Sequence, residues 1–346
     1  MQARTQTADV LKGIAVLLMI QVHIVELFAT EDIYYSSIGK ILLFLGGPPV
    51  APMFMILFGY FIYSSQKTTL QLIKRGLGIF ALGMLLNITL NFNLIVSVYQ
   101  QKIKVDVWPY IFGVDILQFA GLSLIIMAIL KNSFQKYTPL IFSLIFFSTL
   151  LGKLLVHHIP NHNLLLFISA FFYGSSNWSY FPIFPWIAYP LAGMALYQVQ
   201  QHYDFNFIKS IKTKLVGLIM FATFIALTIS YAISIASDLQ TYYHHGTLFF
   251  LWTIAFCAGY GMLIHEITQR IRENIIVNYI KWLGKHVTLI YVLQWIIIGN
   301  LATEIYKTVS NPVYLIGCFI GIVILSNVLA FLILKLKFYL HNRTLA

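Results

Sequence analysis

Charged residues are scarce in this chain, and acidic residues are the scarcest of them. Only 10% of the 346 residues are charged, with 11 Asp and Glu against 22 Lys and Arg, whereas about a quarter of an average soluble protein is charged. Hydrophobic residues make up 59% of the chain, and its mean hydropathy is +0.81. This balance excludes a soluble globular protein and indicates an integral membrane protein with several crossings.

Cysteines and linker sequences are also nearly missing. The two cysteines, Cys257 and Cys318, fall in apolar stretches, where each is expected to act as a small apolar residue. No stretch rich in Gly, Ser or Pro separates the apolar segments, so we expect a single transmembrane domain over residues 1–346. The first apolar run is too long for a signal peptide and lacks a small-x-small cleavage site, which predicts an uncleaved first helix.

Several motifs of soluble enzymes and binding proteins are absent. No Gly-x-Ser-x-Gly motif or activated cysteine is present, so we do not expect a Ser or Cys nucleophile. No basic run with interleaved aromatic residues suggests a nucleic-acid partner. His158 and His162 are four residues apart, but Pro160 interrupts the spacing and no carboxylate or thiolate is adjacent, so we expect no metal.

Apolar stretches of about 20 residues, the length that crosses a bilayer as a helix, occur throughout the chain. We predict ten membrane helices, at about residues 10–29, 40–63, 73–95, 108–130, 138–156, 180–199, 213–236, 247–267, 283–300 and 312–334. An even number of crossings places both termini on the same side of the membrane.

The distribution of positive charge predicts the orientation, because Lys and Arg are enriched in cytoplasmic segments. If the N-terminus is inside, 17 of the 22 Lys and Arg are inside too, and the outer segments hold only five: Lys40, Lys102, Lys104, Lys153 and Lys307. We therefore predict an all-α, polytopic transmembrane helical bundle of about ten helices with both termini cytoplasmic. The net charge of +11 then follows from topology and needs no anionic partner.

The first predicted helix carries four ionisable residues on one face. At about 100° per residue, and with Lys12 at zero, His23 falls near +20°, Asp9 near +60° and Glu26 near −40°. His23 then lies about 16 Å deeper than Lys12, inside the bilayer. An ionisable group at that depth is costly unless it faces a protein interior or a wet cavity, so this stripe is the leading candidate site.

The stretch ADVLKGIAVLLMIQVH resembles the opening signature of the membrane-bound acyltransferases of the acyltransferase-3 and heparan-α-glucosaminide N-acetyltransferase type. That signature has an aspartate, a basic residue followed by glycine, and a histidine eleven residues after the basic one. Asp9, Lys12, Gly13 and His23 fit it, with Lys12 where arginine is usual.

Other segments extend the resemblance over most of the chain. GGPPVAPMFMILFGYFIY resembles the second helix of the family, and Lys74-Arg75 stands where the family has a basic pair. FPIFPWIAYPLAGMALY resembles the helix of the heparan-type branch that contains a Pro-Trp pair and a glycine. LGKHVTLIYVLQW resembles a late family helix, with Gln294 where several branches have histidine.

The resemblance implies a ten-helix acyltransferase that takes an acyl group, usually acetyl, from cytoplasmic acyl-CoA and passes it to a hydroxyl or amine on the far side. A neutral imidazole removes a proton or accepts an acyl group near pH 7, so His23 is expected to be the general base or the acyl acceptor. The other catalytic candidates are Asp9, Glu26 and Asp115, with Glu26 placed to orient His23.

Binding roles are assigned by chemistry and by position. Coenzyme A is strongly anionic, which favours Lys12, Lys74 and Arg75 at the cytoplasmic surface as donor-binding residues. His244, His245, Gln294 and Trp178 are the acceptor-binding candidates. The helix after Gly46 is interrupted by Pro48, Pro49 and Pro52, and such a break is tolerated only beside protein or a wet cavity, so we expect a cavity near His23 that opens outward.

Alternatives remain open at this point. His23, Glu26 and Asp115 would also suit the proton relay of a secondary transporter, and a buried histidine can simply link two helices. A catalytically inactive relative is a third reading. On the acyltransferase reading, we expect a multi-pass protein of a bacterial cytoplasmic membrane that contacts lipid, uses acetyl-CoA and modifies an envelope glycan or glycolipid. The sequence leaves homo-oligomerisation open.

Overall fold

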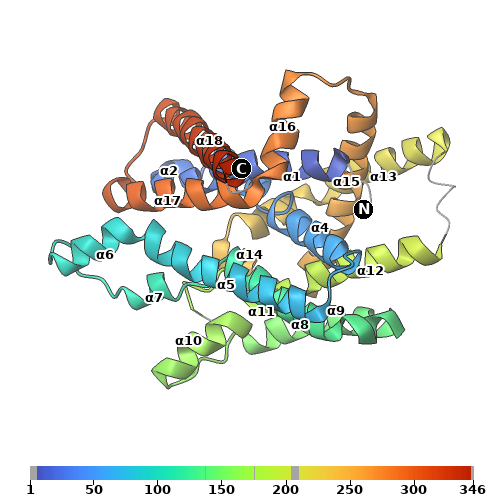
Figure 1. The fold of residues 1–346 in the computed structure, drawn as a ribbon, viewed down its shortest axis with the longest axis horizontal. Coiled ribbons are helices and arrows are strands. Elements are labelled where there is room, and N and C mark those ends of the chain that lie inside the picture. Colours follow the sequence, from blue (N-terminus) through green and yellow to red (C-terminus); the bar gives the residue numbers. More distant parts are fainter. Residues whose placement is uncertain (1–5, 137, 175, 204–209, 344–346) are drawn as a thin grey trace. The chain divides into compact units, whose positions relative to one another are not determined.

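The computed structural model describes residues 6–136, 138–174, 176–203 and 210–343 (Figure 1). Helices dominate, and the described residues contain no β-strand, only the isolated bridges Ala29–Val309 and Val114–Ser179. Arg4 and Lys209, which belong to the predicted cytoplasmic charges, lie outside the described residues. The all-α prediction is confirmed.

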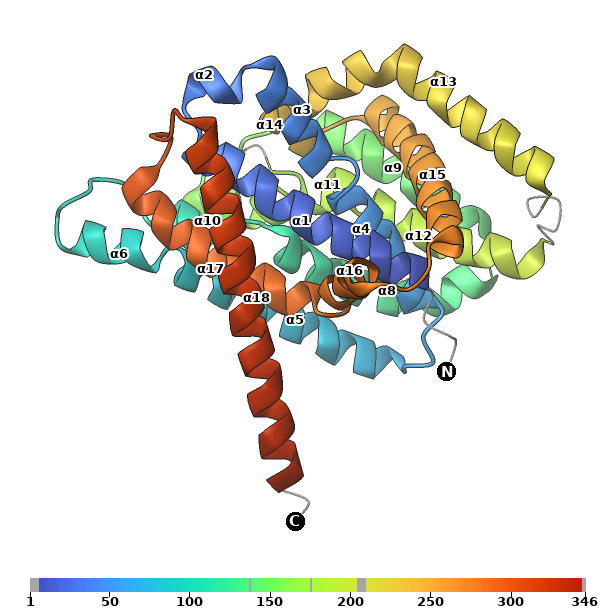
Figure 2. The same cartoon turned by 90° about the horizontal axis from the view of Figure 1, so that it is seen from above.

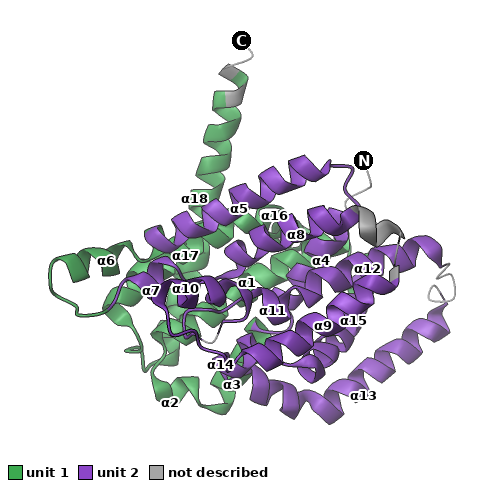
Figure 3. Cartoon of the chain, turned by 90° about the horizontal axis from the view of Figure 1, so that it is seen from below, with its two compact units in different colours: residues 1–46, 89–105, 267–346 green, residues 47–88, 106–266 purple. Residues whose placement is uncertain are grey.

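The chain forms two compact units (Figure 3). Unit 1 comprises residues 1–46, 89–105 and 267–346, and unit 2 comprises residues 47–88 and 106–266. This division does not test the predicted single domain, which stays a prediction. Each unit is described on its own below.

Unit 1 is built around the first helix. Its helices are α1 (Gln6–Phe28), α2 (Glu31–Tyr34), α3 (Ser37–Gly46), α6 (Phe92–Tyr99), α16 (Ile275–Lys285), α17 (Val287–Ile305) and α18 (Pro312–Arg343). Helix α1 packs against α3, α16, α17 and α18, and Ile20, Phe28, Ile290 and Ile298 are buried in the shared core. In Figure 2 the C-terminal part of α18 runs on past the other helices of this unit.

Two glycines allow α1 and α16 to approach closely. A Cβ atom on Gly13 of α1 would overlap the backbone of Ile280, and one on Gly284 of α16 would overlap the backbone of Asp9. Only glycine permits backbones to come this near. The Lys12-Gly13 pair therefore has a packing role as well as a chemical one.

The predicted interruption of the second membrane segment is confirmed. Helix α3 ends at Gly46, a turn covers residues 47–50, and the next helix begins at Ala51 with Pro52 in its first turn, where proline is tolerated. A Cβ on Gly46 would overlap the side chain of Val22. The first half of this segment thus ends beside Val22, which directly precedes His23 on α1.

Unit 2 holds the remaining helices. They are α4 (Ala51–Tyr63), α5 (Thr69–Leu90), α7 (Trp108–Ile111), α8 (Ile116–Lys136), α9 (Thr138–Leu155), α10 (Asn163–Phe172), α11 (Ile183–Trp186), α12 (Ala188–His202), α13 (Ile211–Ala236), α14 (Leu239–Tyr243) and α15 (Thr247–Arg270). The last two residues of α5 and the residues of α15 after Glu266 are assigned to unit 1. Helix α12 packs on α4 and α9. Gly59 of α4 and Gly193 of α12 have no side chains, which allows the two backbones to approach closely.

Seven of the predicted membrane segments coincide with helices that are long and apolar enough to cross a bilayer. The predicted segments 108–130 and 138–156 match shorter apolar helices, Ile116–Lys131 and Pro139–Leu155. Segment 180–199 is divided between α11 and α12, and a further apolar helix, Asn163–Phe172, was not predicted. The protein is a polytopic helical membrane bundle, and its orientation and its ten crossings stay predictions.

Candidate active site

Helix α1 is unbroken from Gln6 to Phe28, so its ionisable residues keep the spacing of a regular helix. Lys12 Nζ lies 3.2 Å from Asp9 Oδ1, one turn earlier on the same face. The Asp9 side chain is buried and the Lys12 side chain is nearly so. Asp9 therefore compensates the charge of Lys12 and holds its ammonium group in place.

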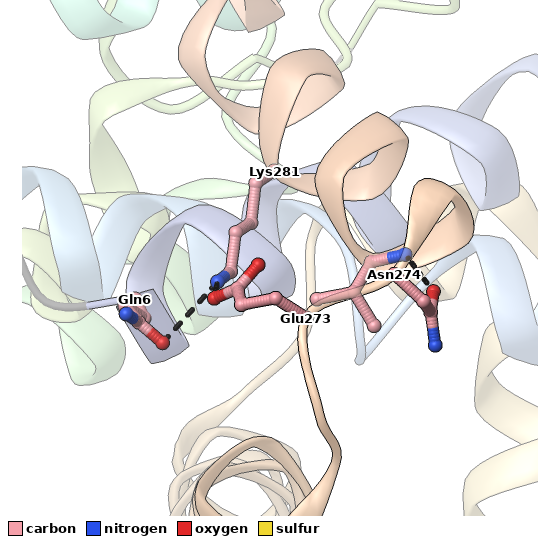
Figure 4. Close-up of polar contacts among 5 residues, drawn as sticks. Gln6, Glu273, Asn274 and Lys281 are labelled. Carbon is pink, nitrogen blue, oxygen red and sulfur yellow. Dashed lines mark hydrogen bonds and ion pairs between the residues drawn. The ribbon is translucent and has the colours of Figure 1, made fainter.

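A second buried lysine lies near the N-terminus of α1. Lys281 of α16 forms an ion pair with Glu273 and donates a hydrogen bond of 3.2 Å to Gln6 Oε1 (Figure 4). Asn274 caps α16 by accepting from the backbone N–H of Val277, which fixes the turn that carries Glu273. Sequence analysis counted Lys281 only as a cytoplasmic charge.

His23 lies on the part of α1 that packs against α17. Its Nδ1 is 3.3 Å from Oε1 of Gln294, which is fully buried, and its ring lies against the indole of Trp295, with ring centroids 4.0 Å apart and tilted by 32°. The structure thus brings together two of the predicted site residues, His23 and Gln294. It adds Trp295, which sequence analysis did not single out.

The contact with Gln294 determines which ring nitrogen of His23 carries the proton. An amide oxygen can only accept a hydrogen bond, so Nδ1 carries the proton and donates it to Oε1. Nε2 then keeps its lone pair, and it has no hydrogen-bond partner among the described residues. A neutral imidazole in this tautomer can take a proton from a hydroxyl or amine.

The other acidic candidates on α1 occupy different places. Glu26 is half-buried one turn beyond His23, and its orienting role stays a prediction. Asp9 is 14 residues before His23, or about 21 Å along a helix. Its carboxylate serves Lys12 and is not in contact range of the imidazole. The structure thus pairs Asp9 with Lys12, and the catalytic role of Asp9 stays a prediction.

Asp115 and the basic pair belong to unit 2. Asp115 Oδ1 accepts a 2.6 Å hydrogen bond from the N–H of Ile116, and Gln118 Oε1 reaches back to the N–H of Asp115. The bond from Gln118 matches one half of a capping box, while the Asp115 carboxylate accepts from the first N–H of α8. Lys74 and Arg75 are exposed in the first turns of α5.

The adjacent histidines 244 and 245 differ in their surroundings. His245 is 2% exposed; Nδ1–H donates to the carbonyl of Tyr242 over 2.7 Å, and Nε2 accepts from the Tyr189 hydroxyl over 2.8 Å. Burial lowers the pKa of both histidines to about 4. Nδ1 of His244 is buried with no hydrogen-bond partner among the described residues, so His244 is the better placed of the two to meet a ligand.

Trp178 lies in the loop between α10 and α11. Its carbonyl accepts from the backbone N–H of Val114, its ring packs on Phe167, and its buried indole N–H has no hydrogen-bond partner in the part of the chain that the structure describes. The same loop is tied to α14 by a 3.3 Å hydrogen bond from Gln240 to Asn177. The acceptor-side candidates Trp178 and His244 thus lie on two linked segments of unit 2.

No group of three or more His, Cys, Asp or Glu side chains that could hold a metal ion occurs among the described residues. The prediction that the protein needs no metal stays a prediction.

A family model described as heparan-alpha-glucosaminide N-acetyltransferase, catalytic, matches residues 4–236. The chain belongs to this family. The match covers Asp9, Lys12 and His23 and ends before α14, so it does not include Gln294 or Trp295. The comparisons with curated proteins and with solved structures found no match. Family membership identifies a membrane acetyltransferase and favours that activity over the transporter alternative.

Proposed function

We propose that the protein transfers an acetyl group from cytoplasmic acetyl-CoA to a hydroxyl or amine of an extracytoplasmic glycan. Family membership supports acetyl transfer in general. The observation that carries the proposal is the state of His23, whose Nδ1 is engaged by Gln294 while Nε2 has no partner among the described residues. A histidine that only linked two helices would gain nothing from an unengaged basic nitrogen inside a membrane helix.

In the proposed reaction, Nε2 of His23 removes the proton from the acceptor as its oxygen or nitrogen attacks the thioester carbon. The new carbon–oxygen or carbon–nitrogen bond forms and the carbon–sulfur bond breaks. Coenzyme A leaves as the thiolate and takes the proton from the imidazolium. In the alternative route, Nε2 attacks the thioester carbon, the carbon–sulfur bond breaks and coenzyme A leaves as the thiolate. The acceptor then attacks the acetyl-imidazolium, the carbon–nitrogen bond breaks, and the acceptor's proton passes to Nε2 and from there to the thiolate.

The donor site is proposed at the N-terminal end of α1. The Lys12 ammonium group, held by Asp9, supplies a positive charge for the phosphates of coenzyme A. Lys74 and Arg75 are exposed. We propose that they also bind the donor, on the ground of their position in the sequence. We assign acceptor binding to Gln294, Trp178 and His244. His245 is proposed to hold the neighbouring His244 in place.

The cellular setting is part of the proposal. We place the protein in a bacterial cytoplasmic membrane, in contact with lipid, with an envelope glycan or glycolipid as acceptor and no nucleic acid involved. Homo-oligomerisation is compatible with this scheme and is not required by it.

The decisive experiment incubates purified protein with radiolabelled acetyl-CoA, with and without an envelope glycan extract. The His23→Gln variant should lose transfer, whereas His265→Gln, which changes an exposed histidine on the membrane helix α15, should retain it. Label on the protein in the absence of acceptor would identify the acetyl-histidine route. Wild-type transfer by His23→Gln would overturn the proposal.

A further inference from the structure

Two N–H groups without partners lie next to His23. Gln294 Nε2 and Trp295 Nε1 are both buried, and neither has a hydrogen-bond partner in the part of the chain that the structure describes. The two residues are consecutive on α17, and each touches the imidazole, Gln294 through its Oε1 and Trp295 through its ring. Both donors therefore belong to the immediate surroundings of the catalytic histidine.

Such groups are unusual in a folded protein. A buried donor without a partner costs about as much free energy as a lost hydrogen bond, and a membrane interior offers no bulk water to compensate for it. Native proteins leave few buried polar groups unpaired, so each one calls for an explanation. Two on adjacent residues beside one imidazole suggest a common acceptor that arrives with the substrate.

We propose that Gln294 Nε2–H and Trp295 Nε1–H form the oxyanion hole for the carbonyl oxygen of the transferred acetyl group. This inference rests on the proposed function of His23. When the acceptor attacks the thioester carbon, the carbonyl π electrons move onto oxygen, which becomes negatively charged. The two N–H groups stabilise that charge, and it is released when the carbonyl re-forms and the thiolate departs with the proton from His23.

The arrangement suits this role because the same residues also hold the base. Gln294 fixes the His23 tautomer with its oxygen and offers its nitrogen to the oxyanion. Trp295 supports the imidazole with its ring face and has its N–H at the ring edge. Donors fixed in advance stabilise a developing charge without the cost of reorganisation.

The test variant is Trp295→Phe, which keeps an aromatic ring against His23 and removes only the N–H. Removal of one oxyanion donor typically lowers kcat by about 10²-fold or more, and we expect this loss with the KM for acetyl-CoA within about twofold of wild type. The matched control is Trp282→Phe on α16 in the same unit, whose ring packs on Tyr279 and His286, and it should keep wild-type kcat.

A second variant, Gln294→Glu, keeps an oxygen for Nδ1–H and removes the amide donors, so it should also lose kcat. Retention of kcat within twofold by Trp295→Phe, or a loss confined to KM, would overturn the oxyanion assignment. The assay includes His23→Gln as a reference. If that variant is inactive while Trp295→Phe is fully active, the oxyanion hole is wrong and the function stands; if His23→Gln is active, the proposed function itself fails.

Discussion

His23 and Gln294 are 271 positions apart in the sequence, and the structure places Nδ1 of the first 3.3 Å from Oε1 of the second. This hydrogen bond joins α1 to α17 and selects the imidazole tautomer whose Nε2 can act as a base. The late helix that carries Gln294 resembles a family helix in which several branches have histidine at this position. We propose that glutamine orients His23 here, since its side chain has both an acceptor and a donor.

We expect Gln294→Leu to lower kcat by at least about 10²-fold, because the ring of His23 loses the contact that fixes it and the proposed oxyanion hole loses a donor. The free energy of unfolding should fall by at most about 1 to 2 kcal/mol, because Nδ1–H of His23 loses its acceptor while leucine also removes an amide nitrogen that has no partner among the described residues. The measurements are steady-state kinetics and thermal unfolding in detergent. Loss of activity together with a large drop in Tm would instead show that Gln294 is needed to fold α17 against α1.

The sequence was most informative where the geometry is local. The shared face of Asp9, Lys12 and His23 follows from the helical period, and the structure confirms a regular α1 with Asp9 beside Lys12. The break after Gly46 was likewise predictable, because consecutive prolines cannot continue a helix. Contacts between distant segments were not predictable in this way.

Lys12 should act in binding the donor. Lys12→Arg is expected to retain most activity, because arginine matches phosphate geometry at least as well as lysine. Lys12→Glu should raise the KM for acetyl-CoA or abolish turnover. Lys285→Glu makes the same charge change at an exposed position of unit 1 and serves as the control. Equal KM values in all four proteins would show that Lys12 is only a topological charge.

Local helix ends and long-range contacts both show where sequence reasoning stops. Asp115 was a candidate acid because it stands alone in an apolar stretch; its carboxylate accepts from the first N–H of α8, and its catalytic role stays a prediction. Trp295 follows Gln294 directly in the sequence. The sequence contains many aromatic residues, and nothing in it indicates that the ring of Trp295 contacts His23. Nothing in the sequence indicated that Lys281 is buried, because its burial depends on the close glycine contact between α1 and α16.

Stability should fall as the pH drops below about 6.5. The pKa of His244 and that of His245 are lowered to about 4 by burial, so both are neutral in the fold, whereas the unfolded chain protonates them near 6.5. The unfolded state therefore binds more protons between these values, and stability present at pH 7 is lost as the pH falls toward 4.

This dependence can be measured as Tm against pH in detergent. The double variant His244→Gln/His245→Gln should show a shallower fall between pH 7 and pH 5 than the wild type, and His157→Gln, at an exposed position of the same unit, should follow the wild type. Parallel curves for the wild type and the double variant would contradict the assignment.

The donor should be required on the cytoplasmic side and the product should form on the other. Lys12 and His23 share one face of an unbroken helix, eleven residues or about 16 Å apart, and the lysine and arginine distribution places the Lys12 end inside. Gly46, where α3 ends and irregular backbone begins, packs against Val22 beside His23. An irregular segment at that depth is tolerated only beside protein or a wet cavity, and we propose such a cavity as the path by which an external acceptor reaches Nε2.

Sealed vesicles of both orientations test this arrangement. Labelled acetyl-CoA added outside should support transfer in inside-out vesicles, whose outer face is the cytoplasmic one, and the label should appear on acceptor enclosed within them. Right-side-out vesicles should react only when acetyl-CoA is loaded inside, and permeabilisation should make the two preparations equal. If external acetyl-CoA works equally well in intact right-side-out vesicles, transfer does not run through the membrane along α1, and His23 would have to meet donor and acceptor from the same side.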